Sequence, residues 1–122
     1  MGSPGCGGGP AELPPLDDAS REAIALFAER FFGALGDRNQ EALNEAVYAG
    51  LPRPERAYFA EAIQDLVGLE RYEIESIDRA AKGLADVGAT VIDGRGRSRH
   101  VSVGLVLSKG QYYAVKVDVV AR

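Results

Sequence analysis

Three arginines stand at alternate positions, Arg95, Arg97 and Arg99, and form a cluster of positive charge. They follow the turn signal Asp93-Gly94 and therefore stand at the end of a predicted hairpin. Because alternate residues of a strand share a face, Arg97 and Arg99 are expected on the face of the valines that follow them. There they can attract an anionic ligand to the mouth of a pocket. The alternative is a solvated hairpin end, where arginines prevent edge-to-edge strand pairing.

Tyrosine hydroxyls are the second set of candidate contacts. An apolar pocket with a few polar groups is the usual design of a small-molecule site. We expect Tyr48, Tyr58, Tyr72 and Tyr113 to present hydroxyls to a pocket lined by Phe27, Phe31 and Phe59. The alternative is that these aromatic side chains simply fill the core. The predicted ligand-binding residues are Tyr58, Tyr72, Arg97, Arg99 and Tyr113, and the predicted ligand is small and either apolar or weakly anionic.

Groups for acid–base catalysis are sparse. A site of the steroid-isomerase type needs a carboxylate base, a tyrosine and a protonated acid inside an apolar cone. The predicted inward face of the last two strands offers one hydroxyl and no carboxylate: Val101, Val103, Leu105, Leu107, Tyr113, Val115, Val117 and Val119. Glu29 and Asp65 lie on polar helix faces, and His100 falls on the face opposite Val101, which favours a surface or interface role. No catalytic residue is assigned.

The amino-acid composition argues against several classes of bound group and partner. With one cysteine and one histidine the chain has no internal disulfide and no cysteine-rich zinc site, and we predict no metal and no cofactor. The net charge of -4 gives no general attraction to phosphate backbones, so nucleic acid is not an expected partner. No apolar run approaches the roughly 20 residues that span a bilayer, which predicts no transmembrane segment.

Residues 1–16 are rich in glycine and proline and predict a flexible tail before a single domain at residues 17–122. Within the tail, Cys6 precedes three consecutive glycines, as at the processed end of a bacterial lipoprotein signal. No hydrophobic region precedes Cys6, so the alternatives are a signal that was removed and a linker with a chance cysteine. The sequence therefore allows a cytoplasmic protein or a periplasmic, membrane-tethered one.

The elements that position these residues divide into helices followed by strands. Asp17 and Asp18 are predicted to cap a helix that Gly36 ends, with an apolar face of Ile24, Phe27, Ala28, Phe31, Phe32 and Leu35. A second helix is predicted from about Asn39 to Tyr48. A third begins at Pro54, buries Phe59, Ala62, Ile63, Leu66 and Val67, and ends at Gly68.

After Gly68 the apolar period changes from helical to alternating. Strands are predicted at 72–77, with an irregularity near Ser76, and at 87–92, 101–107 and 113–119. Turn signals at 93–96 and 108–111 make the last three strands antiparallel neighbours. The predicted fold class is α+β, with three N-terminal helices packed on one face of a curled four-stranded antiparallel sheet.

Two segments resemble the nuclear transport factor 2-like (NTF2-like or SnoaL-like) superfamily. AIALFAERFFGALGDRNQEAL, which begins at Ala23, is similar to the opening helix, and VSVGLVLSKGQYYAVKVDVV is similar to the final hairpin. The resemblance implies the cone-shaped fold of small bacterial members. The chain differs from the family pattern at the last strand, which often begins with Trp in the family and here begins with Tyr112-Tyr113. Members include isomerases, dehydratases, hydrolases and non-catalytic modules, so the fold alone does not select a function.

We therefore expect a non-catalytic module that binds a small ligand or a protein and forms a homodimer through its sheet. Ser102, Gly104 and Ala114, beside Val106 and Val120, are predicted to form a sheet face that a second sheet can approach closely. The alternative function is a small isomerase, dehydratase or hydrolase that acts in the cone.

Overall fold

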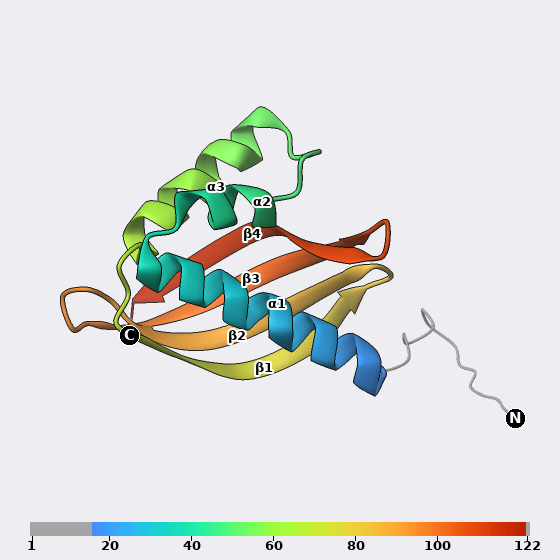
Figure 1. The fold of residues 1–122 in the computed structure, drawn as a ribbon, viewed down its shortest axis with the longest axis horizontal. Helices are drawn as coiled ribbons and strands as arrows, with labels where there is room; N and C mark the ends of the chain where they lie inside the picture. The colour runs from blue at the N-terminus through green and yellow to red at the C-terminus, as the bar shows by residue number, and fades with distance from the viewer. Residues whose placement is uncertain (1–15, 122) are drawn as a thin grey trace, which may run out of the picture.

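The computed structural model describes residues 16–121 as three helices followed by one four-stranded sheet (Figure 1). The elements are α1 (Asp18–Asp37), α2 (Gln40–Ala46), α3 (Arg53–Leu66), β1 (Arg71–Ala81), β2 (Leu84–Ile92), β3 (Ser98–Ser108) and β4 (Gln111–Ala121). The strands pair antiparallel in the order β1-β2-β3-β4, and the helices lie on one face of the sheet. This architecture confirms the predicted α+β fold class.

Most of the predicted tail, including Cys6, lies outside the described residues, while Leu16 packs against the core. None of the described helices is long and apolar enough to cross a membrane.

Helix α1 carries the apolar face that the sheet needs. The Asp17 side chain caps its N-terminus by accepting a hydrogen bond from the Ser20 N–H at 2.7 Å. The prediction that Gly36 ends the helix is wrong, because the helix continues to Asp37 and Arg38 takes the left-handed conformation. A Cβ at Gly36 would stand 3.3 Å from the Leu69 carbonyl oxygen. Glycine at this position therefore serves close packing and not helix termination.

Helices α2 and α3 lie beside β4, which is an edge strand of the sheet. Asn39 caps α2, and Val47, which follows the helix, makes a parallel bridge with Ala114 of β4. Helix α3 starts at Arg53, one residue before the predicted Pro54, and ends at Leu66. It buries Phe59, Ile63 and Leu66 as predicted, whereas Ala62 and Val67 are only partly buried. The edge strand β4 is consequently flanked by helical elements along its course.

The core lies between the helices and the sheet. Alternate residues of the two central strands are buried there: Ala85, Val87, Ala89, Val91, Val101, Val103 and Leu105. The irregularity predicted near Ser76 is confirmed by a register shift between Ile74 and Ser76 in β1. Among the described residues, Asp93 is the single charged side chain that is buried. The inward face of the sheet is thus apolar and filled by side chains.

The inward face of β4 differs from the predicted one because the strand contains a bulge. Gly104 pairs with Lys116 and Leu105 pairs with Ala114, so Val115 is the extra residue. The bulge reverses the alternation, and Ala114 and Tyr112 pack toward the core in place of Tyr113. The prediction that Tyr113 and Val115 share the inward face with Val117 is wrong. Ala114, predicted on the open face, is instead completely buried.

The face of the sheet that the helices leave uncovered is polar and largely acidic. The strand pairing places the carboxylates of Glu73, Asp78, Asp86 and Asp118 on this face, together with the cations of Arg71 and Lys116. His100 lies on this face as predicted, with its Nδ1 3.5 Å from Oε1 of Glu75. Ser102 and Gly104 lie near the middle of the face, and Val120 is 58 % exposed at one end.

Candidate functional site

The five predicted ligand-binding residues do not gather in one pocket. Arg97 and Arg99 lie at the β2–β3 end of the sheet, whereas Tyr113 lies at the β3–β4 turn (Figure 1). Strand β3 has 11 residues and at about 3.3 Å per residue separates its ends by about 33 Å. Arg97 and Tyr113 therefore cannot contact the same small ligand.

The remaining two tyrosines lie elsewhere. Tyr72 stacks on Phe32 with ring centroids 5.3 Å apart, and its hydroxyl donates to the Glu29 carbonyl oxygen at 3.5 Å. Tyr58 is 72 % exposed on α3. Tyr72 thus acts as a packing residue of the α1–β1 contact, and Tyr58 belongs to a separate surface groove.

An apolar groove lies between α1, α2 and the β3–β4 turn, and we call it the α1–α2 groove. Its volume is about 530 Å³. Its apolar lining comes from Ala23, Leu26, Phe27, Phe31, Ala42 and Ala46, with Tyr112 and Tyr113 on the turn side. Phe27 and Phe31, which the sequence placed at a pocket, stack with centroids 6.0 Å apart and form one wall. The α1–α2 groove is thus lined by two of the three phenylalanines that the sequence analysis named.

Few polar groups stand at the rim of the α1–α2 groove. Arg30 and Glu45 contribute the charged groups, and Gln111 contributes an amide. The Tyr113 hydroxyl donates to Oε1 of Gln111 at 2.9 Å, and the Tyr113 ring lies 6.4 Å from that of Tyr48. An apolar wall with a small number of rim groups is the arrangement expected of a ligand site.

A second groove, of about 450 Å³, runs between α3 and β4 and includes Tyr58. Its floor contains Phe59, Val117 and Val119, and its rim carries four carboxylates: Glu55, Glu61, Asp65 and Asp118. The one cation in its lining, Lys116, pairs with Asp118 at 3.3 Å. The negative rim disfavours the anionic ligand that was considered for Tyr58.

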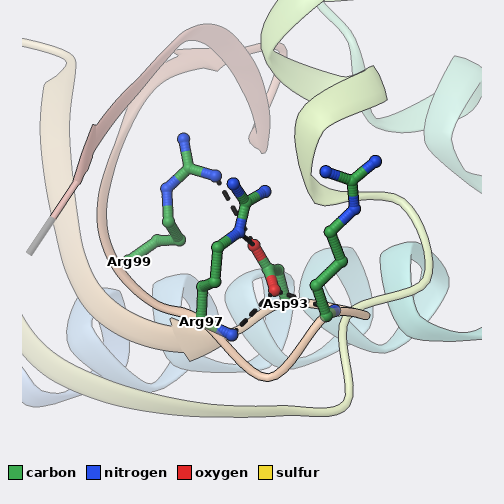
Figure 2. A network of polar contacts seen from close by, with 4 residues as sticks. Asp93, Arg97 and Arg99 are labelled. Carbon is green, nitrogen blue, oxygen red and sulfur yellow. Dashed lines mark hydrogen bonds and ion pairs between the residues drawn. The ribbon is translucent and has the colours of Figure 1, made fainter.

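The arginines at the β2–β3 end converge on one carboxylate, as Figure 2 shows for Arg97 and Arg99. Asp93 is 3 % exposed and accepts hydrogen bonds from the backbone N–H groups of Arg95 and Arg97, each at 2.9 Å. Nε of Arg97 donates to Oδ2 of Asp93 at 2.8 Å, and Arg99 approaches the same oxygen at 3.5 Å. Arg97 and Arg99 are therefore part of a structural network that closes the turn.

The environment of Asp93 determines its charge. Removal from solvent opposes ionisation of this carboxyl, but the hydrogen bonds from Arg97 and Arg95 outweigh it and lower the pKa of Asp93 to about 2. Asp93 is an anion at neutral pH and cannot donate a proton there.

Sequence reasoning missed two features of this end of the molecule. It placed Asp93 only at a turn, although an aspartate four residues before an arginine across a glycine-containing turn is a possible internal ion pair. It gave no role to Arg38, which lies beside the same turn because α1 and α3 end next to each other. No local sequence pattern predicts that Arg38 lies close to the turn between β2 and β3. Within residues 16–121, no three His, Cys, Asp or Glu side chains are grouped to hold a metal ion.

Comparison with solved structures identifies the fold. An NTF2-like protein of unknown function from Silicibacter pomeroyi DSS-3 superimposes with a TM-score of 0.64 at 16% identity, covering 88% of this chain and 100% of that one. A second, from Shewanella baltica, gives 0.63 at 12% identity over 85% and 94% of the two chains. The chain has the NTF2-like fold.

Two further solved structures have a similar fold. Aln2 from a Streptomyces species matches with a TM-score of 0.58 at 17% identity over 90% of this chain and 94% of its own. The intermembrane space region of the chloroplast protein ARC6 matches with 0.51 at 22% identity over 89% and 100%. No family model and no curated protein sequence matches the chain. At these identities the likeness establishes the fold and not an activity.

The Asp93 network makes stability depend on acid pH. Because the folded-state pKa lies below the ordinary value of 3.8, ionised Asp93 stabilises the folded chain above about pH 4, and this contribution is lost as pH falls toward 2. We expect Asp93→Asn to lower the melting temperature at pH 7 and to reduce the difference from wild type as pH approaches 2. Thermal melts between pH 2 and 7 measure this, with the exposed strand residue changed in Asp86→Asn as control. A constant difference across that range would contradict the assignment.

Proposed function

We propose that this NTF2-like chain is a non-catalytic module that binds a small apolar or weakly anionic ligand in the α1–α2 groove. The observation that carries the proposal is the aromatic wall of Phe27 and Phe31 facing a groove of about 530 Å³. Leu26, in the same lining, is 48 % exposed and adds apolar surface beside this aromatic wall. An apolar ligand that covers Leu26 and Phe27 removes their apolar surface from water, and the hydrophobic effect therefore favours binding.

The rim of the groove supports the weakly anionic part of this assignment. Arg30 lines the groove, and no hydrogen bond or ion pair joins its guanidinium to another described residue. A carboxylate or sulfonate at the rim can therefore pair with Arg30 while its apolar body lies on Phe27. Glu45 in the same lining limits the charge that the site accepts, so a single negative charge fits better than two.

The chemistry of the groove favours binding over the alternative of an isomerase, dehydratase or hydrolase. Acid–base catalysis needs a titratable group in the pocket with a pKa matched to its task. The buried carboxylate of the described residues, Asp93, is held ionised and lies at the opposite end of β3 from the groove. The groove offers Glu45 and tyrosine hydroxyls at a solvated rim, an arrangement that serves orientation of a ligand.

Filling the groove tests the proposal. Ala46 is half-buried in its lining, and Ala46→Phe places a ring where the ligand is expected. We expect this change to weaken binding of 8-anilinonaphthalene-1-sulfonate, an apolar body with one negative charge, by about tenfold or more, which corresponds to about 1.4 kcal/mol. Fluorescence titration measures the dissociation constant.

The matched control is Ala57→Phe, which adds the same ring at an exposed position of α3 outside the groove. Circular dichroism on both variants verifies that the fold is retained. Equal affinities for wild type and Ala46→Phe would place the dye elsewhere and refute the proposed site.

We further propose that the chain forms a homodimer through the uncovered face of the sheet. Gly88, Ser102 and Gly104 give the middle of this face a low profile that allows a second sheet to approach. Leu84 and Val120, at its ends, are 40 % and 58 % exposed. The carboxylates on this face oppose close approach of two copies, so the dimer is expected to strengthen as salt is added.

Sedimentation at high micromolar concentration tests the dimer. Ser102→Glu places a further carboxylate and a longer side chain in the middle of this acidic face and is expected to leave only monomer, whereas Asn44→Glu, on exposed α2, keeps the wild-type assembly state. A wild-type chain that remains monomeric at such concentrations rules out the dimer.

A further inference from the structure

A recess at the β2–β3 end of the molecule collects positive charge that the Asp93 network does not neutralise. It has a volume of about 380 Å³ and is lined by Arg38, Arg95 and Arg97 together with Asp65, Asp93 and Val67. It is separate from the α1–α2 groove, because the two stand at opposite ends of β3. We call it the arginine recess.

The charge of the arginine recess opposes that of the whole chain. Four positive charges lie at or beside the recess, on Arg38, Arg95, Arg97 and the neighbouring Arg99. Two negative charges oppose them, on Asp65 and Asp93, so the local excess is two positive charges. The whole chain has a net charge of -4. A local excess of two positive charges in an acidic protein is the electrostatic feature expected of an anion site.

Asp93 engages only some of these arginines. It pairs with Arg97 at 2.8 Å and with Arg99 at 3.5 Å, and these two guanidinium groups share its single negative charge. Arg95 contributes its backbone N–H to Asp93 and leaves its guanidinium outside that contact. No hydrogen bond or ion pair joins the guanidinium of Arg38 or of Arg95 to another described residue. Two guanidinium groups at the recess are thus available to a ligand.

The backbone holds Arg38 in place without a counter-ion. Arg38 ends α1 in the left-handed conformation with φ 58°, and its guanidinium lies against Gly68. A Cβ at Gly68 would stand 2.5 Å from Nη2 of Arg38, so this guanidinium lies close to the Gly68 backbone, and the φ of +85° at Gly68 favours glycine there. The N–H of Gly68 donates to the Leu35 carbonyl oxygen at 2.8 Å, which fixes the ends of α1 and α3 together. The backbone of Arg38 is therefore held beside the β2–β3 turn, and its exposed side chain is accessible to a ligand.

We propose that the arginine recess binds a phosphate group, either as inorganic phosphate or as a phosphomonoester. A phosphate or its monoester carries close to two negative charges at neutral pH, which matches the local excess of two positive charges. Guanidinium groups recognise its oxygens with paired, charge-assisted hydrogen bonds. Val67 in the lining gives the organic part of a monoester an apolar surface. The inference is independent of the proposed function, which concerns a different groove and a singly charged ligand.

The experiment is a titration of the full chain, labelled with ¹⁵N, with inorganic phosphate and separately with phenyl phosphate at pH 7.5 and constant ionic strength. We expect saturable shifts in the amide signals of Arg38, Asn39 and residues 94–97. Tighter binding of phenyl phosphate identifies an ester as the ligand class, and equal binding identifies the free anion. Absence of saturable shifts with both probes overturns the proposal.

Substitutions of arginine test whether phosphate binds in the arginine recess or is attracted only by the overall charge of the protein surface. The double change Arg38→Asn with Arg95→Gln is expected to weaken phosphate binding by about tenfold or more, because charge-assisted hydrogen bonds are lost. Asparagine tolerates the left-handed conformation at position 38, and Arg95 is exposed in a turn, so the fold is retained. Arg95→Gln alone serves if the double variant does not fold.

The matched control removes the same charge elsewhere, with Arg53→Gln and Arg71→Gln at exposed positions outside the recess. It is expected to keep wild-type phosphate affinity, and an equal loss in the control overturns the proposal. Ala46→Phe is also expected to bind phosphate normally, so failure of the α1–α2 groove and failure of the recess are distinguishable.

Discussion

Phe31 and Phe32 lie between α1 and the sheet with 2 % and 0 % of their surface exposed, and the other elements are arranged around them. Phe32 stacks on Tyr72 of β1 with centroids 5.3 Å apart, and Phe31 meets Phe59 of α3 edge-on at 6.3 Å. Full burial of one such ring stabilises a fold by about 1.5–3 kcal/mol, so this pair links three elements at once. The same rings occupy the space between helices and sheet. The groove proposed for a ligand consequently lies at the edge, where α1 and α2 face the β3–β4 turn.

The opposite end of the molecule is organised by hydrogen bonds. Asp93 gathers two backbone N–H groups and the Arg97 guanidinium, so the turn between β2 and β3 has one defined shape. Because the ends of α1 and α3 are joined by the hydrogen bond from Gly68 to Leu35, Arg38 faces that turn. The two ends therefore differ in character: one offers an apolar wall, and the other offers guanidinium groups on a rigid frame.

Much of the fold could be predicted because its signals are local. The apolar face of α1, proline in the first turn of α3 and the alternation in β2 and β3 each follow from a short stretch of sequence. The bulge at Val115 could not, since Tyr112 and Tyr113 are both aromatic and either alternation places an aromatic residue inward. One extra residue moved Tyr113 off the core face and buried Ala114.

The candidate site was harder to predict for a different reason. Strand periodicity assigns Arg97, Arg99 and Val101 to one face, but it does not say how far apart two residues of that face lie. Arg97 and Tyr113 were therefore expected together although the length of β3 separates them. The involvement of Arg38 depends on contact between helix ends, which only the tertiary structure shows.

The central claim is that the ligand lies in the α1–α2 groove and not inside the sheet or at the arginines. The most direct test is an amide ¹H–¹⁵N titration of the unmodified chain with decanoate, an apolar chain with one carboxylate. The account predicts saturable shifts concentrated in residues 23–31, 42–46 and 110–113, which line the groove. Shifts concentrated in 87–91 and 101–105, where the core is packed, or in 93–97, would contradict it.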